Sequence, residues 1–161
     1  MDSKSYKEYL KDIKAFIFDV DGVLTDSSVL VTSEGEMLRK MNTRDGFALK
    51  TAVDAGFLVC IISGGKNEGV RKRLEGLGVQ EINLGAHDKV VHLNKLFDKH
   101  QLKAENVVYM GDDIPDIPSM KLVGLPTCPQ DAVPEVKAVS KYISHKNGGA
   151  GSARDMIEQV Q

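Results

Sequence analysis

Four short apolar segments of this chain are each followed, within two positions, by a glycine or an acidic residue, and this recurrence limits the folds that the chain can adopt. They cover residues 15–20, 57–62, 82–84 and 107–110. Helix-length segments with apolar periodicity lie between them, at residues 45–55, 67–77 and 88–100. After the last of the four segments we expect a short helix from residue 117, a strand at residues 123–126 and a final helix after residue 151. Strands that alternate with helices form mainly parallel sheets with helices on both faces. We therefore predict an α/β fold whose strands end together at one edge, where such sheets bind ligands.

The first apolar segment ends in two carboxylates, Asp19 and Asp21, followed by Gly22. Strand side chains alternate between faces, so these two carboxylates point the same way. Like charges held this close are tolerated where a cation compensates them or one carboxyl keeps a proton. Such a pair suits phosphoryl transfer, in which one Asp attacks phosphorus and the other transfers protons. A solvated strand end with an ordinary Asp-Gly turn is the alternative for this segment alone.

The other three strand ends also carry polar groups. Residues 63–65 read Ser-Gly-Gly, whose hydroxyl and amides suit phosphate oxygens. Asp88 and Lys89 stand at a predicted helix start, and residues 111–116 contain three acids. We predict that these groups converge on one pocket.

The order of these motifs, Asp-x-Asp-Gly-Val, Ser-Gly-Gly, Lys89 and Gly-Asp-Asp-x-x-Asp, resembles the phosphatases of the haloacid dehalogenase superfamily. The resemblance spans residues 13–154. Within the superfamily the chain is similar to the small 3-deoxy-D-manno-octulosonate 8-phosphate phosphatases of lipopolysaccharide synthesis. The stretches that support this are residues 19–26, 42–46, 111–113 and 147–151.

The resemblance implies a role for each motif. Asp19 would be the nucleophile and Asp21 the general acid and base. Ser63 would bind the phosphate and Lys89 would balance its charge. Oxygen ligands and the lack of a Cys/His cluster favour Mg²⁺ as the cofactor. Two further acids would complete the site: Asp112 would bind the Mg²⁺ with Asp19 and the backbone carbonyl of Asp21, and Asp116 would orient Lys89.

Recognition of the substrate, a small phosphorylated sugar acid, is assigned to Gly64, Arg44 and Lys66. The resembling family more often has Thr-Gly-Arg in its second motif, where this chain has Ser63-Gly64-Gly65-Lys66. Lysine is a point charge without the planar fork of arginine, so Lys66 is an imperfect substitute. Arg71 and residues 148–151 are further candidates for the sugar carboxylate, whereas Asp113 and His87 receive no role.

The fold class that we predict is a three-layer, Rossmann-like, mainly parallel sheet with a β-hairpin flap and no cap domain. Residues 28–32 and 36–41 flank Ser-Glu-Gly, which is typical of a hairpin. Asp21 and Ser63 are 42 positions apart, and the hairpin, a helix and a strand use up this length. In the resembling family the hairpins of four subunits assemble over neighbouring sites, which implies a homotetramer through residues 25–43. A solvated flap on a monomer is the alternative.

Composition agrees with one domain over residues 1–161. The net charge is −2, with Lys and Arg scattered, which argues against nucleic-acid binding. No stretch long enough to cross a bilayer and no signal sequence is evident, so we expect no membrane partner and a cytoplasmic location. Cys60, in a predicted strand, and Cys128, in a predicted loop, are expected to be reduced thiols.

The preferred function is therefore Mg²⁺-dependent hydrolysis of 3-deoxy-D-manno-octulosonate 8-phosphate. A phosphatase for a nine-carbon, sialic-type sugar acid 9-phosphate would share the catalytic residues. A receiver-like signalling domain also phosphorylates an Asp, but it lacks a second Asp two positions beyond the acceptor. A non-catalytic assembly protein is disfavoured by the intact set of motif residues.

Overall fold

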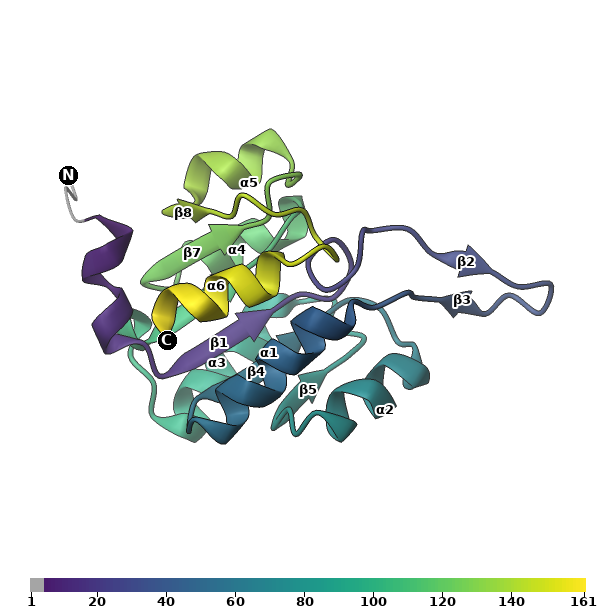
Figure 1. The fold of residues 1–161 in the computed structure, drawn as a ribbon, viewed down its shortest axis with the longest axis horizontal. Helices are drawn as coiled ribbons and strands as arrows, with labels where there is room; N and C mark the ends of the chain where they lie inside the picture. Colours follow the sequence, from purple (N-terminus) through teal and green to yellow (C-terminus); the bar gives the residue numbers. More distant parts are fainter. Residues whose placement is uncertain (1–4) are drawn as a thin grey trace.

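The computed structural model describes residues 5–161 and contains a six-stranded parallel sheet of order β5-β4-β1-β6-β7-β8 (Figure 1). The strands are β1 Ala15–Phe18, β4 Leu58–Ile62, β5 Glu81–Asn83, β6 Val107–Met110, β7 Leu125–Cys128 and β8 Tyr142–Ile143. The central strand β1 is buried along its whole length and pairs with β4 and β6. The predicted α/β, mainly parallel fold is confirmed.

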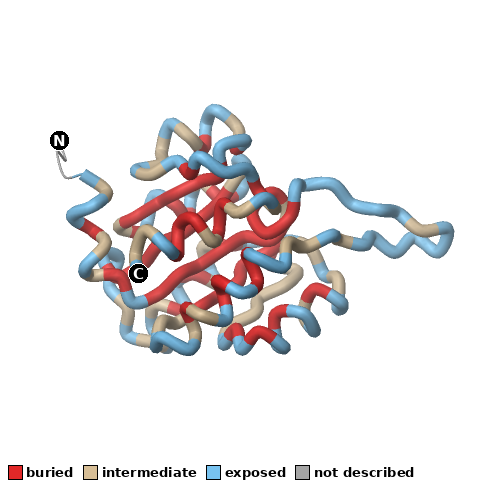
Figure 2. The backbone as a smooth tube through the Cα atoms, in the orientation of Figure 1, coloured by how far each residue is buried: buried red, intermediate tan, exposed pale blue. Residues whose placement is uncertain are grey.

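Helices cover both faces of the sheet. They are α1 Thr43–Asp54, α2 Glu68–Gly76, α3 Lys89–His100, α4 Ile117–Met120, α5 Pro134–Val139 and α6 Ser152–Val160. Because strand side chains alternate, Phe16 and Phe18 join one core with α1, α2 and α6. Ile17 joins the opposite core, which includes buried residues of α3, α4 and α5. The buried backbone in Figure 2 follows this sheet and the inner faces of the helices.

The predicted hairpin is confirmed and extends away from the sheet (Figure 1). Its strands, β2 Leu30–Val31 and β3 Met37–Leu38, are shorter than the sequence suggested. Figure 2 shows almost the whole hairpin exposed, and Leu30 and Val31 are 68% and 62% exposed. The flap therefore presents apolar side chains that this chain leaves uncovered.

Most boundaries of the predicted helices and strands differ from the structure by one or two residues, and one α-helix and one strand were missed. The strand predicted at residues 123–126 lies at Leu125–Cys128: the Gly124 amide donates to the carbonyl of Ala104, which precedes β6, and the pairing with β6 begins at Leu125. Cys128 was therefore wrongly placed in a loop. Helix α5 and the two-residue strand β8 were not predicted, since such short elements show no periodicity.

Both cysteines are buried and unpaired, which confirms the prediction of free thiols. Within residues 5–161, none of the helices combines the length and apolar character needed to span a bilayer.

Candidate active site

The predicted site residues gather at the carboxyl edge of the sheet. Phe18 of β1 lies opposite Ile61 of β4 and Met110 of β6, so the residues that follow these strands are neighbours in space. The amide of Asp19 donates to the carbonyl of Met110 (3.2 Å). The parallel register therefore brings the first, second and fourth motifs together although they are far apart in sequence.

Lys89 lies between two carboxylates at this edge. Its Nζ is 2.9 Å from Asp19 Oδ2 and 2.8 Å from Asp116 Oδ1, and all three side chains are buried. The side chain of Asp88 caps α3 by accepting from the Val91 amide, which holds Lys89 at the first position of the helix. Burial acts to lower the pKa of Lys89, but Asp19 and Asp116 raise it above its usual value. Lys89 is therefore a fixed ammonium beside the predicted nucleophile.

Asp116 is held by donors on every side. Besides Lys89, it accepts hydrogen bonds from the hydroxyl of Tyr109 (2.8 Å) and the amide of Asp112 (3.0 Å). Sequence reasoning missed Tyr109, because a tyrosine within an apolar strand gives no sign of its polar partner. Burial, followed by Asp116, raises the pKa of this phenol well above its usual value, so the hydroxyl remains a donor.

Three carboxylates surround this single ammonium. Ligand oxygens of Asp19, Asp112 and Asp116 all lie within 4.8 Å of one another. Burial, reinforced by Asp116 and opposed by Lys89, raises the pKa of Asp19 well above its usual value. Burial, Asp116 and Asp113 raise the pKa of Asp112 to about 7. A surplus of negative charge on hard oxygen ligands fits a divalent cation such as Mg²⁺.

Within this cluster the two carboxylates with spare acceptor capacity are Asp19 and Asp112. Asp116 accepts four hydrogen bonds, two on each oxygen, whereas Asp19 accepts one on each oxygen, so Asp116 is the poorest ligand of the three. Gly22 has a positive φ of 86°, and a Cβ there would collide with the carboxylate of Asp112. The glycine after the first motif thus lets the fourth motif approach it closely.

Asp21 is half-buried and pairs with a residue that sequence reasoning did not single out. Arg39, directly after β3, places its Nε 3.0 Å from Asp21 Oδ1 and its Nη2 3.1 Å from Asp21 Oδ2. The only available signal was an arginine inside the predicted flap, and nothing in the sequence indicated that it folds back onto the first motif.

The second motif lies beside the third. Ser63 is buried, with its Oγ 3.3 Å from the Gly65 amide, whereas Gly64 is exposed with open space beside it. The amide of Gly85 donates to the carbonyl of Gly65 (2.9 Å), which joins the two loops. Lys66 is exposed, and its methylene chain lies against Gly85. This loop leaves backbone and hydroxyl groups beside the carboxylates.

Comparison with known proteins identifies the family. The model for haloacid dehalogenase-like hydrolases matches residues 77–154. The chain is 35% identical, over 92% of its own length and 79% of the relative's, to the 3-deoxy-D-manno-octulosonate 8-phosphate phosphatase KdsC of Salmonella typhi. The chain belongs to the KdsC family of haloacid dehalogenase-like hydrolases. As a KdsC-family protein it is a phosphatase, that is, a phosphoric monoester hydrolase.

Solved structures agree with this assignment. A probable YrbI-family phosphatase of Pseudomonas syringae pv. phaseolica superimposes with a TM-score of 0.94 at 37% identity, covering 96% of this chain and 88% of that one. The 3-deoxy-D-manno-octulosonate 8-phosphate phosphatase of Moraxella catarrhalis gives a TM-score of 0.92 at 32% identity, covering 96% and 89%. The latter structure contains magnesium, phosphate and the free sugar acid. The family assignment does not support the receiver-domain or assembly-protein alternatives.

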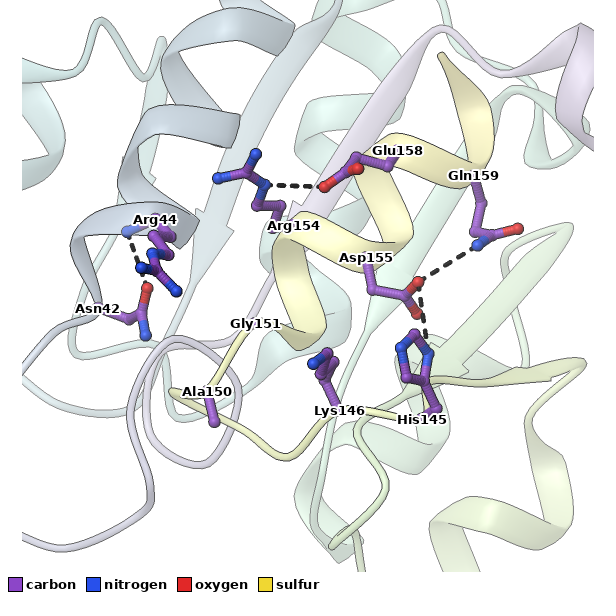
Figure 3. Close-up of a pocket in the computed structure, with 10 residues that line it drawn as sticks. All are labelled: Asn42, Arg44, His145, Lys146, Ala150, Gly151, Arg154, Asp155, Glu158 and Gln159. Atoms are coloured by element: carbon purple, nitrogen blue, oxygen red, sulfur yellow. Dashed lines mark hydrogen bonds and ion pairs between the residues drawn. The ribbon is translucent and has the colours of Figure 1, made fainter.

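Arg44 of this KdsC-family chain lies apart from the motif cluster. It stands at the start of α1 and lines a surface cavity of about 500 Å³ with Arg154 of α6, His145 and Lys146 (Figure 3). None of the motif carboxylates, Ser63 or Lys89 lines this cavity. A role of Arg44 in substrate binding stays a prediction, and Arg154 is a basic neighbour that the sequence did not suggest.

The glycine-rich segment at residues 148–151 supports the first motif of the KdsC-family protein. The Gly149 amide donates to the carbonyl of Val23 (3.0 Å), and a Cβ at Gly148 would collide with the carbonyl oxygen of Gly22. The turn that follows Asp21 therefore packs directly on this segment, and the glycines are needed for close approach.

Proposed function

We propose that the protein hydrolyses 3-deoxy-D-manno-octulosonate 8-phosphate to the free sugar acid and phosphate, with Mg²⁺ as the cofactor and a phosphorylated Asp19 as the intermediate. The observation that carries this proposal is the buried Lys89, which bridges Asp19 and Asp116 beside Asp112. An ammonium and a metal-binding cluster next to one carboxylate are what attack on a phosphate dianion requires.

In the first step Asp19 attacks phosphorus through a carboxylate oxygen. The bond between phosphorus and the sugar oxygen breaks, and the carboxyl of Asp21 gives its proton to that leaving oxygen. Lys89 contacts Asp19 directly, so it is placed to balance the charge of the phosphoryl oxygens. The hydroxyl of Ser63 and the amide of the exposed Gly64 would bind the same oxygens from the other side.

In the second step water attacks the phosphorus of phosphorylated Asp19. Asp21 takes a proton from that water, the bond from phosphorus to the Asp19 oxygen breaks, and phosphate leaves. Mg²⁺, held by Asp19, Asp112 and the backbone carbonyl of Asp21, would neutralise charge on the transferring group throughout. Asp116, anchored by Tyr109, would keep Lys89 in position.

The substrate class is proposed from the relatives. The Salmonella enzyme is named for the eight-carbon acid 8-phosphate, and the Moraxella structure holds magnesium, phosphate and the sugar acid. The reaction would belong to lipopolysaccharide precursor synthesis and proceed in the cytoplasm. A nine-carbon, sialic-type acid 9-phosphate stays the alternative substrate, because the residues that read the sugar, Arg44 and Lys66, are assigned only by prediction.

The assembly that we propose is a homotetramer formed through residues 25–43. The exposed apolar side chains of Leu30, Val31 and Met37 support it, since an uncovered apolar surface of this kind favours association. A neighbouring subunit would then supply the cover that a cap domain provides in other enzymes.

Steady-state phosphate release tests the proposal. Purified protein with Mg²⁺ is assayed with both sugar-acid phosphates and with p-nitrophenyl phosphate. We expect the eight-carbon acid to give the highest kcat/KM, and Asp19→Asn to lower kcat by roughly 10⁴-fold or more. Asp98→Asn, on the exposed face of α3, is the matched control and should behave as wild type. A higher kcat/KM for the nine-carbon acid would make that acid the proposed substrate instead. An active Asp19→Asn enzyme would exclude a phosphorylated Asp19 as the intermediate.

A further inference from the structure

Arg39 is the one hairpin residue whose charged group enters the active site. Its side chain is 7% exposed, although the flanking Leu38 and Lys40 are exposed. The guanidinium makes two parallel hydrogen bonds to Asp21, which is 33% exposed. A two-bond pair of this kind fixes the plane of the carboxylate as well as its charge. Asp21 is therefore oriented by the flap and not only by its own loop.

Gly65 leaves the space that this guanidinium uses. A Cβ at Gly65 would lie 3.0 Å from Arg39 Nη2 and 3.5 Å from Asp21 Oδ2. Any side chain at position 65 would therefore crowd the pair between Arg39 and Asp21. The second motif, through Gly65, leaves space for the guanidinium, and the flap supplies Arg39.

Hydrogen bonds also anchor the base of the flap close to Arg39. Arg39 Nη1 donates to the carbonyl of Met37 (2.8 Å), and Asn67 Nδ2 donates to the same carbonyl (3.0 Å). Asn67 also caps α2 by accepting from the amide of Val70. The guanidinium is thus held by its own strand, and that strand is tied to the start of a helix of the main body. Its position is built into the fold and is not that of a free surface side chain.

We propose that Arg39 is a positioning residue for the reaction: it aims the carboxyl of Asp21 at the oxygen that leaves the phosphate. The inference rests on the proposed function, in which Asp21 transfers the proton. A carboxylate has about four acceptor positions, and the pair with Arg39 occupies two of them. The remaining positions carry the proton, and the rigid fork sets their direction. The flap thereby contributes directly to proton transfer at the site that it covers.

The inference is tested by measuring how the effect of an Arg39 substitution on kcat/KM depends on the leaving group of the substrate. A sugar oxygen needs a proton as it leaves, whereas p-nitrophenolate does not, and kcat/KM reports the step in which the leaving group departs. We expect Arg39→Ala to lower kcat/KM for the sugar-acid phosphate by about 10- to 100-fold. For p-nitrophenyl phosphate the loss should be below about threefold. Asp21→Asn should show the same contrast, and Arg39→Lys, which keeps the charge but not the fork, should fall between wild type and Arg39→Ala.

Lys72→Ala is the matched control, because Lys72 is an exposed cation of α2 that lies outside both the flap and the active site. It should leave both kcat/KM values unchanged. Equal losses with both substrates would mean that Arg39 only supports the fold, and faster turnover of the sugar-acid phosphate by Arg39→Ala would mean that it restrains Asp21. Either result overturns the inference.

Direct contact with the sugar is tested separately. The free sugar acid inhibits hydrolysis of p-nitrophenyl phosphate with a constant that Arg39→Ala should not change, and a rise of tenfold or more would reassign Arg39 to substrate binding. If the wild type hydrolyses p-nitrophenyl phosphate but no sugar-acid phosphate, the proposed substrate is wrong. In that case kcat/KM of wild type and Arg39→Ala is compared for glycerol 1-phosphate and p-nitrophenyl phosphate. The test of Arg39 then does not depend on the identity of the natural substrate.

Discussion

Replacing Asp112 by asparagine should stabilise the metal-free protein at alkaline pH. Burial, Asp116 and Asp113 raise the pKa of Asp112 to about 7 from a usual value of 3.8. Between these two values the folded state keeps a proton that the unfolded chain has released. The free energy of unfolding therefore falls as the pH rises from about 4 to about 7, and the full penalty is present above pH 7.

The size of the effect follows from that shift. The difference of 7 − 3.8 = 3.2 pKa units corresponds to an upper limit of about 4 kcal/mol. Because the carboxyl is partly exposed, water screens part of the interaction, and we expect Asp112→Asn to gain about 1 to 2 kcal/mol at pH 8. At pH 5.5 the gain should be smaller by about 1 kcal/mol.

Urea unfolding followed by circular dichroism, in EDTA and at one protein concentration, measures this difference at pH 5.5, 6.5 and 8. Burial also raises the pKa of Asp19 and of Asp45, and because wild type and Asp112→Asn both contain these acids, the result is read as the difference between the two proteins. Asp98→Asn is again the control. Saturating Mg²⁺ should reverse the order, since ligand at 100 times its Kd adds about 2.7 kcal/mol to the wild type and far less to Asp112→Asn. An Asp112→Asn protein that is less stable than wild type at pH 8 in EDTA would refute the reasoning.

Three further substitutions test other parts of the structure. Gly148→Ala should lower the free energy of unfolding by about 1 to 3 kcal/mol and reduce turnover, because a Cβ there would collide with the carbonyl of Gly22; thermal unfolding and phosphate release measure both. Val31→Glu should dissociate the proposed tetramer, as seen by size-exclusion chromatography with light scattering. Lys66→Ala should raise KM for the sugar-acid phosphate by about tenfold with little change for p-nitrophenyl phosphate, whereas an effect of Arg44→Ala alone would move carboxylate recognition to that residue.

Each of these tests has a contradicting outcome. Gly76→Ala, at a helix position with open space beside it, is the control for Gly148→Ala, and equal stability of the two variants would remove the packing argument. A wild-type monomer in solution, or an unchanged assembly in Val31→Glu, would exclude the flap as the interface. Lys72→Ala, an exposed lysine of α2, should be neutral, and a similar loss in this variant and in Lys66→Ala would indicate a general charge effect.

The alternation of apolar strands with amphipathic helices was sufficient to predict the parallel sheet and the place of its site. Parallel strands end at the same edge of a sheet, and Asp19, Ser63 and Asp112 each follow a strand. The sequence alone therefore predicted that these three residues lie close together. Strand β6 was predicted with its observed bounds, Val107–Met110. Elements as short as β8 were missed, because two residues carry no period and depend on the neighbouring strand for their existence.

The sequence by itself determined which chemical groups stand at the strand ends, since local periodicity and glycine positions set where each strand stops. Only the tertiary structure decided the partners of those groups. Tyr109 of β6 meets Asp116 of the turn that follows this strand, and Arg39 meets Asp21 because the flap folds back onto the first motif. Contacts of this kind depend on where each side chain lies in three dimensions, and the local pattern of residues does not show that.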